Sequence, residues 1–107
     1  MKKSLNKNVL RIALISVGAI KKSGISVDSA YVFGSQAKNA AHPFSDIDLC
    51  IVSQQFGNDR QSDRIKLMRI TDDIDDAIEP HPFSPEEMKS KYDPLVKEIK
   101  TTGIEIL

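Results

Sequence analysis

The most informative segment of this chain is YVFGSQAKNAAHPFSDIDLCIV, residues 31–52. It opens with apolar residues typical of a strand, and Gly34 and Ser35 interrupt that pattern. After a turn-forming segment comes DIDLCIVS, residues 46–53, whose second half is apolar on both faces and indicates a central strand. Two strands joined through a glycine turn therefore form the centre of the predicted structure.

Helical and extended patterns alternate on both sides of this stretch. The predicted elements are helices at 5–23, 36–41, 60–70, 85–88 and 94–102, strands at 27–33, 46–53 and 74–79, and an edge strand at 104–107. Ser4 caps the first helix, Asp93 caps the last, and Pro80 ends the strand at 74–79. This order predicts one α/β (α+β) domain over residues 1–107, with a small mixed β-sheet of three or four strands flanked by helices.

Two helices carry predicted apolar faces. In the helix at 60–70, Ile65 and Met68 form the buried edge, with Leu67 as a further candidate. The first helix has apolar residues at helical spacing and others that widen the face: Leu10, Ala13, Leu14, Val17 and Ile20, then Val9, Ile12, Ile15 and Ala19. Either this helix is wedged between the sheet and another helix, or part of its face is left for a second chain.

The composition excludes several classes of protein. Fifteen basic and fifteen acidic residues give a net charge of zero among 107 residues, so we expect no nucleic-acid partner. The longest apolar-rich run, residues 9–20, contains Arg11 and is shorter than the roughly 20 residues of a membrane span. The basic N-terminus lacks a cleavage site for a signal peptide, and Cys50 is the single cysteine, expected in the core. We expect a cytoplasmic protein.

Two features of residues 31–52 could carry chemistry. The Gly34–Ser35 turn lets the backbone approach a phosphate closely and presents a hydroxyl and amides as donors. In the following strand, alternation puts the carboxylates of Asp46 and Asp48 on one face, where they repel each other unless a cation lies between them. Mg²⁺ prefers such ligands together with substrate phosphates, and paired ions hold both oxygens of a displacement at phosphorus. The sequence therefore indicates phosphoryl or nucleotidyl transfer.

This spacing resembles a known family signature. Gly34–Ser35, ten residues, then Asp46–Ile47–Asp48 is similar to the G-S-x10-D-x-D motif of the minimal nucleotidyltransferases, small relatives of DNA polymerase β. The resemblance implies the nucleotidyltransferase fold, with Gly34 and Ser35 at a triphosphate and Asp46 and Asp48 as magnesium ligands. Lys38 holds the family's basic position and could reach a phosphate oxygen.

The resemblance also implies a third carboxylate on the next strand. Asp75 and Glu79 share one face of the predicted strand at 74–79 and are the two candidates. The segment FSPEE, residues 83–87, resembles the family's closing Y-T-P-E-E, and counting back from it favours Glu79. His42 and His81 each precede a proline and are interpreted as surface or supporting groups rather than acid–base catalysts.

The resemblance implies an enzyme that transfers AMP from ATP to a hydroxyl, with two Mg²⁺ ions. Such domains are paired with HEPN-type toxins, and as antitoxins they modify a tyrosine of the toxin. A chain this short leaves little room for an acceptor domain, so the acceptor would lie on a partner protein or a second copy. The alternative is a non-catalytic module of the same fold that neutralises a partner by covering it.

Overall fold

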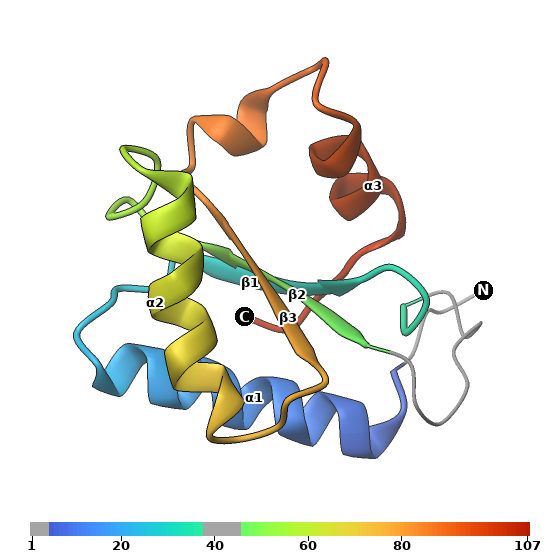
Figure 1. The fold of residues 1–107 in the computed structure, drawn as a ribbon. Coiled ribbons are helices and arrows are strands. Elements are labelled where there is room, and N and C mark those ends of the chain that lie inside the picture. The colour runs from blue at the N-terminus through green and yellow to red at the C-terminus, as the bar shows by residue number, and fades with distance from the viewer. Residues whose placement is uncertain (1–4, 38–45) are drawn as a thin grey trace.

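The computed structural model describes residues 5–37 and 46–107. Over these residues the chain forms a four-stranded sheet with helices packed against both faces (Figure 1). The elements, in chain order, are α1 (Lys7–Lys22), β1 (Ser29–Phe33), β2 (Ile47–Val52), α2 (Arg60–Asp72), β3 (Ile78–Phe83), the 3-10 helix η1 (Glu87–Lys89), α3 (Pro94–Thr102) and β4 (Ile104–Glu105). The predicted mixed sheet flanked by helices is confirmed.

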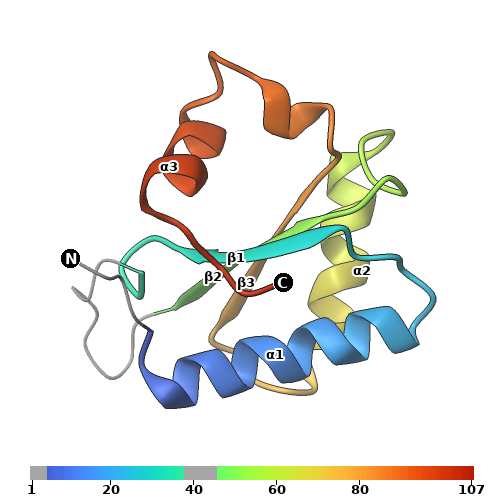
Figure 2. The same cartoon turned by 180° about the vertical axis from the view of Figure 1, so that it is seen from behind.

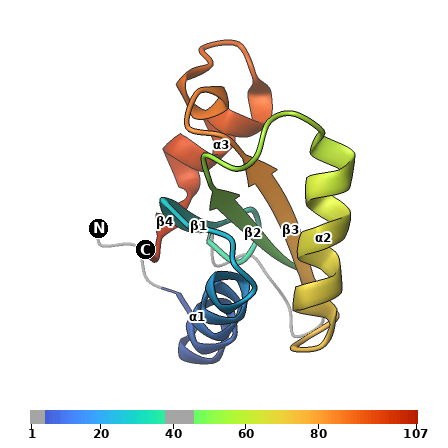
Figure 3. The same cartoon turned by 90° about the vertical axis from the view of Figure 1, so that its left-hand side faces the viewer.

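The sheet has the strand order β3-β2-β1-β4 and is mixed. β1 pairs antiparallel with both β2 and β4, whereas β2 pairs parallel with β3. Viewed from behind, the C-terminal segment runs along the β1 side of the sheet (Figure 2), and a side view shows α2 beside β3 at the other edge (Figure 3). The parallel pair is possible because α2 forms the crossover from β2 to β3.

Each face of the sheet is covered by different helices. One face packs on α1 and α2 through an entirely apolar cluster that includes Val32, Leu49, Ile51, Leu67 and Ile78. The opposite face packs on α3 through a smaller cluster with Phe33, Cys50, Val52, Phe83, Val96 and Ile99. In Figure 1, α1 lies below the sheet and α3 above it. Strand alternation separates these two sets, because successive side chains point to opposite faces.

Side-chain caps set where the helices begin. Asn6 accepts hydrogen bonds from the amides of Asn8 (2.8 Å) and Val9 (3.4 Å), so α1 starts at Lys7 rather than at the predicted Leu5. The predicted cap Ser4 lies outside the described residues, as does part of the predicted helix at 36–41. The predicted cap of α3 is confirmed, since Asp93 accepts from the amides of the next turn.

The prediction for the third strand was wrong in its boundaries. β3 begins at Ile78 and runs through Pro80 and Pro82 to Phe83, whereas the sequence predicted that Pro80 would end it. The carbonyls of Ala77 and Phe83 accept hydrogen bonds from the amides of Ile47 and Ser53, so the odd-numbered residues of β3 point their backbone N–H and C=O groups toward β2. The nitrogens of both prolines therefore face away from the sheet, where an edge strand needs no donor.

The helices bury only part of the faces that the sequence predicted. In α2, Ile65 and Met68 are exposed, whereas the further candidate Leu67 is buried together with Thr71, which was not predicted. In α1, Leu14 and Ile15 are 44% and 51% exposed. Part of the wide apolar face of α1 is thus left uncovered, as one of the two interpretations of the sequence expected. None of the helices in the described residues is long and apolar enough to span a membrane.

Candidate active site

The glycine turn that follows β1 lies directly against a carboxylate of β2. Gly34 has a φ of 74°, a left-handed conformation that residues with a Cβ rarely adopt. A Cβ at Gly34 would collide with the Oδ2 atom of Asp48. The sequence needs glycine here both for the backbone conformation and for the space that the Asp48 side chain occupies. The backbone of the Gly34–Ser35 turn and this carboxylate therefore share one site, with Ser35 half-buried beside them.

Strand pairing brings a second carboxylate to the same place. Phe33 of β1 pairs with Asp48 of β2, and Asp48 pairs with Glu79 of β3. Paired residues of adjacent strands point to the same face, so the two carboxylates lie side by side on the α3 face of the sheet. Both side chains keep access to solvent, at 30% exposed for Asp48 and 42% for Glu79. An approaching ligand can reach them.

A histidine completes this group. His81, two residues after Glu79, places Nε2 3.1 Å from the Asp48 Oδ1 atom. One ligand atom each from Asp48, Glu79 and His81 lie within 4.8 Å of one another, and they are the single group of this kind that the described residues contain. Two carboxylates and an imidazole at this separation could hold a divalent cation.

Two neighbours fix the orientation of these side chains. The imidazole of His81 packs edge-on against Phe33, with ring centroids 5.1 Å apart and an interplanar angle of 61°. Arg64 of α2 donates to the Oε2 atom of Glu79 at 3.3 Å. This exposed ion pair adds little to folding stability, but it holds one carboxylate oxygen and leaves the second one for another partner.

The other predicted site residues lie at different distances from this group. Asp46 is exposed and precedes the first residue of β2, and it does not belong to the group of three among the described residues. Asp75 lies in the turn before β3, where its side chain accepts a hydrogen bond from the Ala77 amide at 2.9 Å. Of the two candidates for the third carboxylate, Glu79 is therefore the one beside Asp48. Lys38 and His42 lie outside the described residues.

His81 is the functional candidate that the sequence reasoning missed. The prediction ended the strand at Pro80, so it did not extend the alternation from Glu79 to His81. The available signal was the spacing Glu79-x-His81, which puts both side chains on one face of any strand that contains them. That signal was usable only with the knowledge that β3 is an edge strand that tolerates both prolines.

The chain matches a known protein family over most of its length. The sequence model of the family described as "Polymerase beta, Nucleotidyltransferase" matches residues 17–107. The chain belongs to this nucleotidyltransferase family. A search of curated proteins found no match.

Two solved structures share the nucleotidyltransferase fold of this chain. A Sulfolobus solfataricus protein, provisionally described as a nucleotidyltransferase, is 19% identical, with a TM-score of 0.65 over 92% of this chain and 78% of that protein. A toxin–antitoxin structure with AMP-PNP is 20% identical, with a TM-score of 0.56 over 96% of this chain and 73% of its own. At these identities the likeness concerns the fold.

A nucleotidyltransferase needs a place for phosphate oxygens next to a cation. In this chain the Gly34–Ser35 turn offers backbone without side-chain bulk, and Asp48 and Glu79 offer hard oxygen ligands beside it. The donor set of Asp48, Glu79 and His81 thus fits a divalent cation. The chemistry this arrangement supports is displacement at a phosphorus atom held between the turn and the carboxylates.

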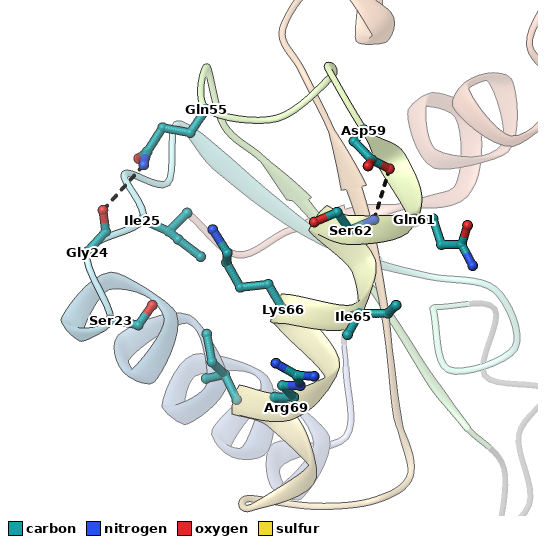
Figure 4. Close-up of a pocket in the computed structure, with 11 residues that line it drawn as sticks. Ser23, Gly24, Ile25, Gln55, Asp59, Gln61, Ser62, Ile65, Lys66 and Arg69 are labelled. Carbon is teal, nitrogen blue, oxygen red and sulfur yellow. Dashed lines mark hydrogen bonds between the residues drawn. The ribbon is translucent and has the colours of Figure 1, made fainter.

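A cavity elsewhere in this nucleotidyltransferase domain has a different character. It measures about 700 Å³ and lies between the end of α1 and α2, with Lys66 and Arg69 among its lining residues (Figure 4). Two of its polar side chains form structural hydrogen bonds. Asp59 caps α2 through the Ser62 amide at 3.1 Å, and Gln55 donates to the Gly24 carbonyl at 3.4 Å. This cavity lies between two helices, and none of Asp48, Glu79 and His81 lines it.

Proposed function

We propose that this protein transfers AMP from ATP to a hydroxyl group of a partner protein, in a reaction that depends on Mg²⁺. The observation that carries the proposal is the contact between the Gly34 turn and Asp48, with Glu79 beside them on the next strand. A phosphate-binding turn and a pair of carboxylates on one face are the groups that nucleotidyl transfer requires.

In this proposal the residues of the site have different roles. The amides of the Gly34–Ser35 turn bind the triphosphate, where the missing Cβ allows close approach. Asp48, Glu79 and Asp46 hold the metal, which supplies charge neutralisation at the phosphate and acceptor oxygens when it is bound. Lys38 contacts a phosphate oxygen as a point charge. Because the site faces solvent, the acceptor can reach the α-phosphorus from outside the domain.

The acceptor in this proposal is a tyrosine of a HEPN-type toxin, with the chain acting as its antitoxin. One relative of the same fold is part of a toxin–antitoxin structure with AMP-PNP, which supports both a protein partner and an adenine nucleotide. The exposed residues Leu14 and Ile15 of α1 give a partner apolar surface to bind. Basic side chains of Lys7 and Arg11 border these residues, so the partner surface would carry acidic groups.

The test is incubation of the protein with ATP labelled at the α-phosphate, Mg²⁺ and the protein that co-purifies with it. We expect label on the partner. Asp48→Asn should reduce the transfer more than about 100-fold, because mutation of residues that only hydrogen-bond to metal ligands already lowers metal affinity or activity by about 10–100-fold. Asp72→Asn is the matched control, since Asp72 is an exposed acid at the end of α2. Equal transfer by both variants would contradict the proposed site.

The alternative, a non-catalytic module that covers its partner, predicts a different result in the same assay. In that case no label is transferred, and the Asp46→Ala, Asp48→Ala double variant still inhibits the partner. Under the proposed function the double variant binds the partner but leaves it active. Inhibition of the partner by this variant therefore separates catalysis from covering.

A further inference from the structure

The distance between the side-chain atoms of Asp48 and His81 matches the distance between two adjacent ligand atoms of one cation. The Oδ1 and Nε2 atoms lie 3.1 Å apart. In an octahedral site with bonds of about 2.1 Å, adjacent ligand atoms lie about 3.0 Å apart and opposite ones about 4.2 Å. One ligand atom each of Asp48, Glu79 and His81 lie within 4.8 Å of one another, so Glu79 is near enough to offer a third ligand. The two hydrogen-bonded atoms are therefore already at the distance that two adjacent ligand atoms of one metal ion would have.

The position of the imidazole is fixed by its surroundings. His81 lies on β3 between Pro80 and Pro82, two buried residues whose rings lock their backbone φ. Its ring rests edge-on against Phe33, the residue before the Gly34 turn, and its side chain is only 18% exposed. A ligand held on a strand and packed against an aromatic ring loses little freedom when an ion binds.

The geometry points to His81 as a nitrogen ligand of the catalytic cation, so that this site binds a first-row transition ion such as Mn²⁺ more tightly than the Mg²⁺ of the proposed reaction. Mg²⁺ takes oxygen ligands almost exclusively, whereas imidazole nitrogen binds transition ions well. A site of carboxylates alone lacks this preference. The inference deepens the proposed function, because it concerns the ion of the same site and rests on Asp48 and Glu79 being its ligands.

The test measures metal binding by the full chain without nucleotide. With Mn²⁺ bound, pulsed electron paramagnetic resonance should detect coupling to a ¹⁴N nucleus of imidazole. In His81→Asn, which replaces the imidazole by an amide too short to reach the position of Nε2, this coupling should disappear. Calorimetry should show the ratio of Mn²⁺ to Mg²⁺ affinity falling at least about tenfold in that variant.

The second histidine provides a matched control. The chain contains two histidines, so a nitrogen signal in the wild type comes from His42 or His81. His42→Asn should keep both the ¹⁴N coupling and the preference for Mn²⁺. Absence of the coupling in the wild type, or its survival in His81→Asn, would overturn the inference.

The outcome is separable from that of the proposed function. A wild-type protein that shows the imidazole coupling but transfers no nucleotide would keep the metal inference and refute the transfer. A wild-type protein that transfers nucleotide but shows no coupling would refute the nitrogen ligand alone. The two measurements use different readouts on the same protein.

Discussion

The two faces of the sheet are built by the same strands, yet only one of them is completely closed. On the α1 and α2 face, Leu49 and Ile51 of β2 are fully buried among apolar residues. On the α3 face, Cys50 is buried in the same way, but Asp48, two residues earlier in β2, is partly exposed to solvent. The short helix α3 covers one part of this face and leaves the carboxylates uncovered. One strand can therefore hold the core with one set of side chains and the site with the other.

The largest contrast between the faces should appear in stability. Leu49→Ala, in the closed face, should lower the free energy of unfolding by about 2–5 kcal/mol, because it leaves a cavity among tightly packed neighbours. Asp48→Asn, one residue away, should change it by less than about 1 kcal/mol, since the side chain is partly solvated and its hydrogen bond can persist. The chain has no tryptophan, so urea unfolding followed by circular dichroism is the suitable measurement. Equal losses in the two variants would contradict this division of roles.

Two glycines with left-handed backbones test the role of the contact between Gly34 and Asp48. Gly34→Ala should lower stability by about 1–2 kcal/mol for its left-handed backbone, and its Cβ would also displace the Asp48 carboxylate. Gly24→Ala is the matched control, because Gly24 has a φ of 101° but open space where a Cβ would go. Both variants should lose stability, whereas only Gly34→Ala should lose the rise in melting temperature that Mg²⁺ and ATP produce. Identical ligand-induced shifts would show that the contact with Asp48 has no role in binding.

The difference between the faces also explains which features could be predicted from the sequence. The Gly34 turn, Asp48 and the central position of β2 follow from local order and alternation, which need no knowledge of the rest of the chain. Glu79 was predicted as the third carboxylate from its face of the expected strand and from the family resemblance. The extension of β3 to His81 did not follow, because whether a proline ends a strand depends on which neighbour that strand has.

The faces of the helices show the same limit. In α2, apolar residues occur at several positions around the helix, and the spacing pointed to Ile65 and Met68, with Leu67 as a further candidate. The sheet and α1 instead contact the side that carries Leu67 and Thr71, where both side chains are fully buried. A pattern with more than one apolar stripe is resolved only by where the neighbouring elements lie.

An effect confined to high pH concerns Cys50, which lies in the closed part of the α3 face. Burial raises the pKa of the Cys50 thiol to about 12, partly opposed by the positive charge of Arg60. The thiol of the unfolded chain ionises near its ordinary pKa of 9.0, so above that pH the unfolded state loses a proton that the folded state keeps. Stability due to this group is therefore complete below about pH 9 and falls by about 1.4 kcal/mol per pH unit until the folded thiol ionises.

Cys50→Ala isolates this effect, because it removes the thiol while the other groups that titrate at high pH remain in both proteins. The cavity that alanine leaves lowers stability by an amount that does not depend on pH, so the slopes are compared rather than the values. Urea unfolding between pH 8 and pH 10.5 should show the wild type losing stability more steeply than the variant above about pH 9. Parallel curves would mean that the thiol reaches solvent in the folded state, and the α3 face would then be open beyond the carboxylates as well.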